Sequence, residues 1–148
     1  MRQDREVATL ELVREMYDGF GRGDFDPFMR LMADDVRWHL PGRSPYAGTT
    51  ESRDALVERL IRQSEASEGT TSIEWVDGVA VDDVVVVLER LRASRHGSSI
   101  DVWATVVYRF EEGRVVEAWD VFSDQVAYDA FWSGQAPATG PDTTPPAS

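Results

Sequence analysis

Strands of alternating residues fill the second half of the chain and constrain its fold more than any other feature. Apolar side chains recur there at every second position, and the segments with this period are 73–81, 84–94, 100–110 and 115–123. Short turns that contain Gly97 and Gly113 separate the last three segments, a pattern typical of antiparallel β-hairpins. We therefore expect a meander of long antiparallel strands.

Helical periodicity dominates the first half of the chain. Apolar residues spaced by three and four positions indicate helices at 4–20, 26–33 and 52–67, and a short closing helix is expected at 124–132. A further strand is expected at 36–40, with a loop over 41–50. Helices gathered on one side of an antiparallel sheet make an α+β domain.

The end of the chain has a different composition. Residues 133–148 hold four of the seven prolines, together with Gly, Ala, Ser and Thr. Such a segment cannot bury enough apolar surface to order itself. We expect one domain over residues 1–132 and a disordered tail over residues 133–148.

Both faces of the predicted strands are largely apolar. If helices cover one face, the other still exposes Leu91, Trp103, Val107 and Trp119. A patch of this size is too large to leave in water. We therefore expect a homodimer through the outer face of the sheet.

Composition excludes several classes of function. The 148 residues carry a net charge of −12, which argues against a nucleic-acid partner and against binding to anionic membranes. The chain has no cysteine and two histidines, and it lacks a glycine-rich phosphate loop, so we expect neither a metal nor a cofactor. No segment has the length of a membrane helix and the charged N-terminus is unlike a signal peptide, so we expect a cytoplasmic protein.

Asp120 is the first candidate for a functional side chain. Centring the hairpin on Gly97 pairs Arg90 with Ala104. Alternation then brings Arg90, Arg92 and Asp120 to one face of the sheet and sends Glu89 to the other. Asp120 could act there as a general base or acid, or it could form a structural ion pair with Arg90. Arg92 could equally point into solvent at the end of its strand.

Four passages, in their order and spacing, resemble a known family. They are Gly23-Asp24 with Met32-Ala33-Asp34-Asp35-Val36, Trp38-His39-Leu40-Pro41-Gly42 with Tyr46-Ala47-Gly48, Leu88-Glu89-Arg90-Leu91, and Gly113-Arg114-Val115 with Ala118-Trp119-Asp120-Val121-Phe122. Together they resemble the SnoaL-like polyketide cyclases of the nuclear transport factor 2-like superfamily, which also contains ketosteroid isomerases and limonene-epoxide hydrolases. The resemblance extends over residues 8–132 and implies a curved sheet that wraps around a helix into a cone with a deep apolar pocket. It does not fix a reaction, because this fold serves enzymes and binding modules alike.

The resemblance implies roles for the charged residues. Asp120 matches the catalytic aspartate of the cyclases and of the epoxide hydrolases, and Arg90 matches the arginine of the hydrolases' Asp-Arg-Asp triad. Arg92 stands where that triad has its second aspartate. A site of Asp120 with two arginines would be net positive, would keep the aspartate ionised and would stabilise an anion. The presence of Arg92 in place of the second aspartate argues against epoxide hydrolysis by the Asp-Arg-Asp mechanism.

His39 is a further candidate, because it precedes Leu40-Pro41-Gly42. Aligned on Gly42, it falls where the isomerases carry their general-base aspartate; aligned on Pro41, Leu40 falls there instead. His39 also matches a water-positioning asparagine of the hydrolases. Histidine is a residue type that suits proton transfer near pH 7. A hydrogen-bonded polar residue at a strand end is the alternative interpretation.

Several aromatic residues are candidates for the walls of the pocket. They are Tyr17, Trp38, Tyr46, Tyr108 and Phe122. Tyr46 could also donate a hydrogen bond to a substrate oxygen. The oxyanion-hole tyrosine of the isomerases would fall near Met16, and Tyr17 would point in another direction. Packing in the core is an equally good explanation for each of these aromatic residues.

Together, the residues and the resemblance predict a cofactor-free enzyme that cyclises or isomerises an apolar, oxygenated natural-product intermediate. Asp120 would be the general base or acid, Arg90 and Arg92 would stabilise negative charge, and His39 would assist. An aldol ring closure would suit this set, and so would opening of an epoxide by the substrate's own hydroxyl to form a cyclic ether. Two alternatives stay open: an epoxide hydrolase that uses Asp120, Arg90 and His39, and a non-catalytic ligand-binding or accessory protein.

Overall fold

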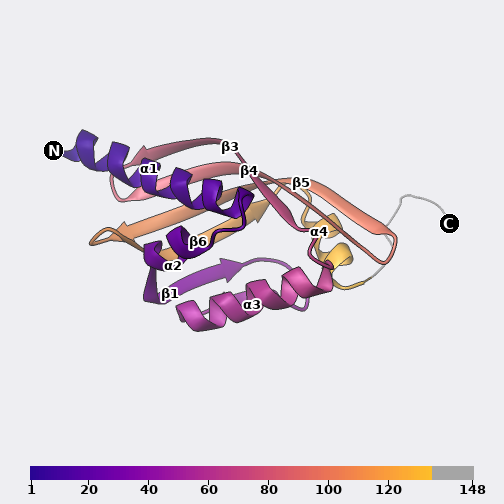
Figure 1. Cartoon of the computed structure of the whole chain (residues 1–148). Helices are drawn as coiled ribbons and strands as arrows, with labels where there is room; N and C mark the ends of the chain where they lie inside the picture. Colours follow the sequence, from indigo (N-terminus) through magenta and orange to yellow (C-terminus); the bar gives the residue numbers. More distant parts are fainter. Residues whose placement is uncertain (135–148) are drawn as a thin grey trace.

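The computed structural model describes residues 1–134, which form four helices and six strands (Figure 1). In chain order they are α1 (Arg2–Gly21), α2 (Asp26–Leu31), β1 (Met32–Leu40), β2 (Gly48–Thr50), α3 (Arg53–Ala66), β3 (Ser72–Val81), β4 (Val84–Arg95), β5 (Ser98–Glu111), β6 (Arg114–Phe122) and α4 (Gln125–Trp132). The predicted α+β class, with a curved sheet and a short closing helix, is confirmed. Apart from its first two residues, the tail predicted at 133–148 lies outside the described residues.

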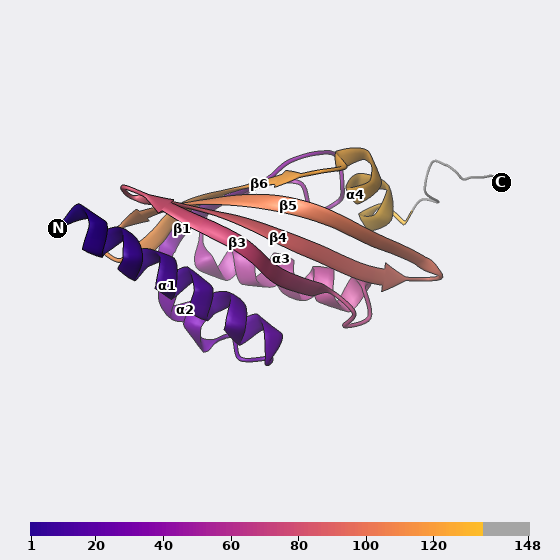
Figure 2. The ribbon, with the colours of Figure 1, turned by 90° about the horizontal axis from the view of Figure 1, so that it is seen from above.

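All six strands form one curved sheet in the order β2-β1-β6-β5-β4-β3. Neighbouring strands are antiparallel except β1 and β6, which run parallel. Figure 2 shows α1, α2 and α3 on one side of this sheet, which we call the inner face. The strand β1 begins at Met32 rather than at residue 36, and the short strand β2 lies within the predicted loop.

Side chains at the helix starts fix the helices that border the inner face. The hydroxyl of Ser52 accepts a hydrogen bond from the backbone N–H of Ala55 at 3.1 Å and so caps α3. Asp124 caps α4 in the same way, accepting from the N–H of Ala127 at 3.0 Å. Both caps satisfy donors that the first turn of a helix leaves unpaired.

Two apolar clusters fill the space between the inner face and the helices. The α1-side cluster lies under α1 and α2 and includes Val13, Phe28, Trp38, Val87, Val106, Tyr108 and Ala118. The α4-side cluster packs α4 against the other end of β4 and β5 and includes Leu40, Leu91, Ala93, Ile100, Val102, Tyr128 and Trp132. The inner face is thus covered from two ends, and the two clusters meet in its middle.

The β4–β5 hairpin has a tighter turn than predicted. Arg95 pairs with Ser98, so only His96 and Gly97 form the loop, and both have positive φ, 48° and 82°. Two such residues make the turn whose twist matches that of antiparallel strands. Arg90 therefore pairs with Trp103, not with Ala104. A slip of one residue exchanges the two faces of a strand, so the predicted faces of β4 are wrong.

The outer face of the sheet mixes apolar and charged side chains. Trp103 and Val121 are 43% and 58% exposed there. Arg109 forms an ion pair with Glu117 on the same face, with 3.2 Å between Nη2 and Oε1. Leu91, predicted to lie on this face, is buried on the inner one because of the shifted register. The homodimer through the outer face stays a prediction.

None of the helices within residues 1–134 combines the length and the apolar character that crossing a membrane requires.

Candidate active site

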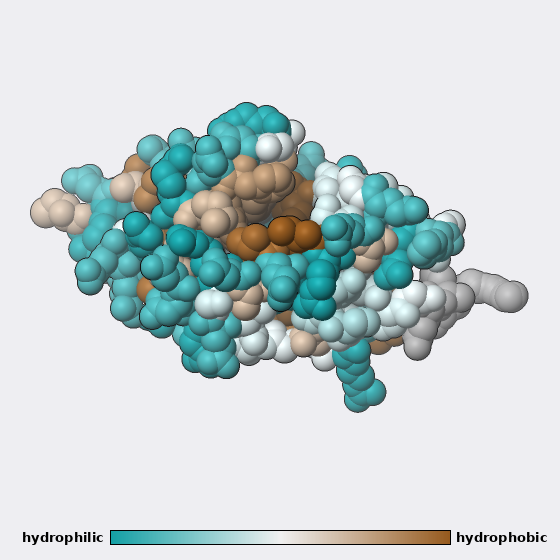
Figure 3. Space-filling model, turned by 60° about the horizontal axis from the view of Figure 1, so that its bottom comes forward, coloured by the Kyte–Doolittle hydropathy of each residue, from teal (hydrophilic) through white to brown (hydrophobic). Residues whose placement is uncertain are grey.

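Polar side chains interrupt the inner face where the two apolar clusters meet. Glu89 of β4 follows Val87 of the α1-side cluster at the next inward position. Asp120 of β6 lies two strands away on the same face, because its partner on β5 is the buried Val106, which in turn pairs with Val87. Figure 3 shows that one side of the molecule is hollowed, with apolar side chains in the hollow and polar side chains around it.

Glu89 is 5% exposed and lies at the end of a chain of hydrogen bonds through two tyrosines. The hydroxyl of Tyr17 donates to Glu89 Oε1 at 2.7 Å, and the hydroxyl oxygens of Tyr17 and Tyr108 are 2.6 Å apart. Because the one hydroxyl proton of Tyr17 goes to Glu89, Tyr108 must donate to Tyr17. Burial and the charge of Asp120 raise the pKa of Glu89 to about 8, although the Tyr17 hydrogen bond acts against this. At pH 7 most molecules therefore carry Glu89 as a neutral carboxylic acid.

Asp120 has a different environment and a lower pKa. The indole Nε1 of Trp38 donates to Asp120 Oδ2 at 2.7 Å. Asp120 keeps some exposed surface although Ala118 and Val106, its neighbours on the same face, are fully buried. Burial raises the pKa of Asp120 to about 6, opposed by the Trp38 hydrogen bond and by the charge of Arg59. At pH 7 most molecules therefore carry Asp120 as a carboxylate.

The helix α3 adds a cation to this group. Its buried residues are Leu56, Arg59 and Gln63, which share one face of the helix. Arg59 is 4% exposed. Gln63 Nε2 donates to the hydroxyl of Tyr128 at 3.1 Å, and the ring of Phe122 stacks on that of Tyr128 with 3.8 Å between centroids. The site thus has a polar side formed by α3 and an aromatic wall formed by β6 and α4.

Four of the predicted site residues come together in this structure. Asp120 and Trp38 are hydrogen-bonded, and Tyr17 and Tyr108 form the chain of hydrogen bonds that ends on Glu89. Tyr17 is buried on α1, as is its neighbour Met16, and its hydroxyl reaches the inner face of the sheet. The catalytic roles of these four residues stay predictions.

The structure separates Arg90 and Arg92 from Asp120. Arg90 donates from Nε and Nη2 to Asp101 on the outer face, at 2.8 Å each, and Arg92 Nε lies 3.6 Å from the same carboxylate. The prediction that both arginines share a face with Asp120 is wrong, because it assumed a longer loop at Gly97. The net positive site predicted from these arginines is not formed either. Glu89, Asp120 and Arg59 take its place.

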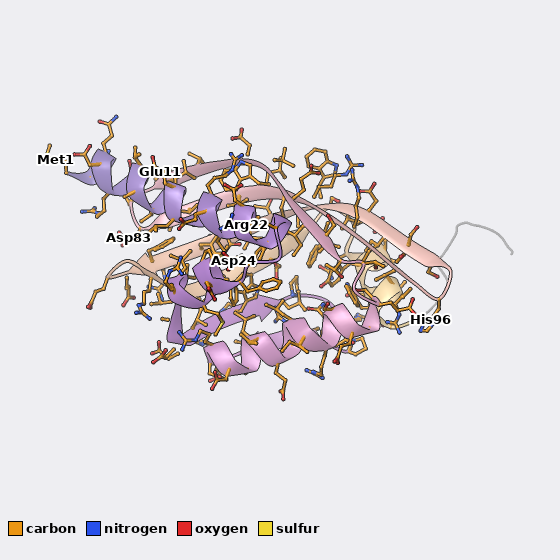
Figure 4. All side chains as sticks on the ribbon, in the orientation of Figure 1. Met1, Glu11, Arg22, Asp24, Asp83 and His96 are labelled. Carbon is orange, nitrogen blue, oxygen red and sulfur yellow. The ribbon has the colours of Figure 1, made fainter. Side chains whose placement is uncertain are left out.

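His39 also lies on the outer face, because Trp38 takes the inward position of β1. Its Nε2 is 2.6 Å from Glu117 Oε2, and its Nδ1 is 2.8 Å from the hydroxyl of Thr49. The prediction of His39 as a partner of Asp120 does not fit this arrangement. His96, the second histidine, lies at the tip of the β4–β5 hairpin, at the opposite end of β4 from Asp83 (Figure 4).

The last two predicted wall residues belong to the α4-side cluster. Tyr46 packs edge-on against Trp132, with ring centroids 5.6 Å apart, and the guanidinium of Arg62 lies over its ring at 5.6 Å. Phe122 stacks on Tyr128 next to Asp120 along β6. Tyr46 therefore supports the α4 end, whereas Phe122 lines the site itself.

Sequence reasoning missed Glu89, Arg59, Gln63 and Tyr128 as site residues. For Glu89 the signal was present: it continues the alternation of Val85 and Val87, and a two-residue turn would have placed all three inward. For α3, polar residues at the inward positions of an amphipathic helix were the available signal. Within residues 1–134, no three His, Asp or Glu side chains gather closely enough to hold a metal ion.

Comparison with known proteins agrees with the fold. A family model described as a SnoaL-like domain matches residues 13–118. The uncharacterized protein Rv0034 of Mycobacterium tuberculosis is 31% identical over 127 residues, which cover 85% of this chain and 97% of the relative. The structure of Bal32a, from a soil-derived mobile gene cassette, is similar at a TM-score of 0.80 and 33% identity, covering 84% of this chain and 95% of that one.

A structure from Jannaschia sp. CCS1, named as a candidate SnoaL-like polyketide cyclase, is similar at a TM-score of 0.66 and 18% identity. The match covers 88% of this chain and 95% of that one, and it is a likeness of fold alone. The family model covers well over half of the chain, and its match agrees with the curved sheet and helices described above. The chain belongs to the SnoaL-like domain family.

Proposed function

We propose that the chain is an enzyme that transfers protons on an apolar, oxygenated small molecule, with Asp120 as general base and Glu89 as general acid. The observation that carries the proposal is the placement of two carboxyl groups on one buried face with different pKa values, about 6 for Asp120 and about 8 for Glu89. Environments that separate the pKa values of two neighbouring acids define a base and an acid at neutral pH.

The reaction that fits this pair begins at a carbon next to a carbonyl. Asp120 takes the proton from that carbon, and Glu89 gives its proton to the carbonyl oxygen as negative charge develops there. The Tyr108–Tyr17 chain of hydrogen bonds supports Glu89 as it becomes charged. For an isomerisation, Asp120 gives its proton to another carbon of the conjugated enol, and the enol oxygen returns its proton to Glu89. For a ring closure, the enol carbon bonds to a second carbonyl carbon, whose oxygen takes the proton from Asp120 and becomes a hydroxyl, while the enol oxygen returns its proton to Glu89.

The same pair could form a cyclic ether. Glu89 would protonate an epoxide oxygen while Asp120 removes the proton of the substrate's own hydroxyl, whose oxygen then bonds to the epoxide carbon as the ring opens. Epoxide hydrolysis through Asp120, Arg90 and His39 has no such support, because Arg90 and His39 lie on the outer face. Membership of the SnoaL-like family favours ring closure over simple isomerisation.

Exchange of carbon-bound hydrogen tests the proposal. An apolar bicyclic ketone, 2-tetralone, is incubated with the protein in heavy water, and loss of its α-proton signals is followed by NMR. We expect Asp120→Asn to reduce the exchange rate roughly 100-fold or more, because a positioned base contributes about that much. Asp101→Asn removes a carboxylate from the outer face and is the matched control, with an unchanged rate.

The pH profile of this exchange gives a second readout. The rate should rise through about pH 6 as Asp120 ionises and fall above about pH 8 as Glu89 loses its proton. Glu89→Gln should remove the alkaline fall. A wild-type rate in a folded Asp120→Asn variant, or no exchange by the wild type at any pH, would instead support a non-catalytic ligand-binding protein.

A further inference from the structure

Arg59 is a buried cation with unused hydrogen-bond donors. It projects from α3 into the site and is 4% exposed. Its Nε and Nη1 atoms are fully enclosed and have no hydrogen-bond partner among residues 1–134. Within the same residues the guanidinium forms no ion pair closer than 4 Å. A buried charge without a partner is costly, so a position of this kind calls for an explanation.

The groups around Arg59 do not complete its hydrogen bonds. Asp120 is the carboxylate that faces Arg59, and each stabilises the charged form of the other, but they are not in contact. Gln63, one turn further along α3, donates its amide N–H to the hydroxyl of Tyr128. Arg62 lies on the outside of the helix against Tyr46 and adds repulsion rather than a partner.

An aromatic wall lies beside this cation. The rings of Phe122 and Tyr128 stack with 3.8 Å between their centroids, and Tyr128 is hydrogen-bonded to Gln63 on the same face of α3 as Arg59. A guanidinium next to flat apolar surfaces matches a ligand with an anionic oxygen group on an aromatic or polycyclic body. The oxygen of a neutral ligand can also accept from Arg59, but an anionic oxygen forms stronger, charge-assisted hydrogen bonds and neutralises the buried charge.

We propose that Arg59 binds an anionic oxygen group of the substrate, a carboxylate in the simplest case, and that the substrate class is therefore an aromatic or polycyclic acid. The inference rests on the proposed function for the place of the substrate next to Asp120. Pairing with the guanidinium would anchor the anionic end on the α3 side and leave the apolar body against Phe122. Because Nε and Nη1 are enclosed in this structure, binding requires a change of the arginine rotamer that presents these N–H groups to the ligand.

Two probes of equal shape and different charge test this inference. The affinities of naphthalene-2-carboxylate and naphthalene-2-carboxamide are measured by titration calorimetry at pH 7. We expect the wild type to bind the carboxylate roughly 10- to 100-fold more tightly, as charge-assisted hydrogen bonds allow. Arg59→Met should abolish the preference, because it should weaken binding of the carboxylate far more than binding of the carboxamide.

Arg62→Met is the matched control, since it removes an arginine from the same helix outside the site, and its preference should equal that of the wild type. Arg59→Gln is a second variant in case the first one folds poorly. Equal affinities in the wild type, failure of both probes to bind, or a preference that survives in both Arg59 variants would overturn the inference.

These outcomes are separable from those of the exchange assay. 2-Tetralone is neutral and needs no contact with Arg59. A carboxylate preference that depends on Arg59, without any proton exchange, would support the ligand class and refute the catalysis. Exchange that depends on Asp120, without a carboxylate preference, would do the reverse.

Discussion

Each side of the sheet has an arginine and an aspartate that attract each other, but one pair is hydrogen-bonded and exposed, and the other is buried and not in contact. On the outer face, Arg90 and Asp101 are joined by two hydrogen bonds of 2.8 Å, and both side chains are partly exposed. On the inner face, Arg59 and Asp120 attract each other without forming an ion pair, and Arg59 is buried. The hydrogen bonds from Arg90 hold the pKa of Asp101 below its usual range, whereas burial raises the pKa of Asp120 to about 6.

This contrast teaches which carboxylates can react. A carboxylate that is paired and solvated stays ionised and accepts no proton near neutral pH. Glu89 and Asp120 on the inner face lose contact with water, and their hydrogen bonds make up for only part of that loss. Their pKa values therefore rise toward neutral pH, where a carboxyl group can both accept and donate a proton. Burying these carboxyl groups lowers the stability of the folded chain. The difference between the two faces can therefore be measured by unfolding experiments without any substrate.

Glu89 should have the largest effect on stability. Its pKa is about 8 in the folded chain against a usual value of 4.5, so between these values the folded state holds a proton that the unfolded state has lost. The stabilising contribution is complete below pH 4.5 and is lost as the pH rises through about 8. Wild-type stability should therefore fall between about pH 6 and pH 9 by roughly 2–4 kcal/mol. Urea unfolding of Glu89→Gln should show no such fall.

Glu117→Gln is the control on the outer face. Hydrogen bonds from His39 and Arg109 lower the pKa of Glu117, so this group loses no stability as the pH rises. Its substitution should leave the alkaline fall of the wild type intact. A Glu89→Gln variant with the same pH dependence as the wild type would mean that the inner acid is not perturbed by burial.

Arg59 should have the next largest effect. Replacing an unpaired buried charge by an apolar residue of similar length removes its desolvation cost, so Arg59→Met should be more stable by roughly 1–3 kcal/mol. We choose a pH near 5 for this measurement, where Asp120 is largely protonated and does not depend on the cation. Arg90→Met on the outer face should give no gain in thermal unfolding. A loss of stability in Arg59→Met would show that the guanidinium is paired in solution.

The fold class could be predicted from the sequence because helices and strands each space their apolar residues with a regular period. Alternation over β3 to β6 and helical spacing over α1 and α3 predicted the class and the order of the elements other than β2, and the resemblance to the SnoaL-like family implied the curvature of the sheet. Each such pattern extends over about ten or more residues, so misplacing the end of an element by one residue does not change the predicted fold class.

The site was harder to predict because it depends on single residues. One residue of loop length at His96-Gly97 decided whether Arg90 or Glu89 faced Asp120, and the left-handed conformation of His96 was not evident from its side chain. Trp38 and His39 are likewise neighbours on β1 whose roles depend on which one points inward. Arg59 was missed because a charge on an inward helix position contradicts the pattern by which such positions are recognised.

Asp101→Asn should have the smallest effect, and it tests the other half of the comparison. Its pairing with Arg90 is exposed, so the gain from attraction is offset by side-chain entropy and is screened by salt. We expect the melting temperature to fall by about 2 °C or less. In about 0.5 M NaCl the difference from the wild type should vanish. A larger fall that persists in salt would mean that Asp101 is enclosed in solution, and that the outer face is covered as the predicted homodimer requires.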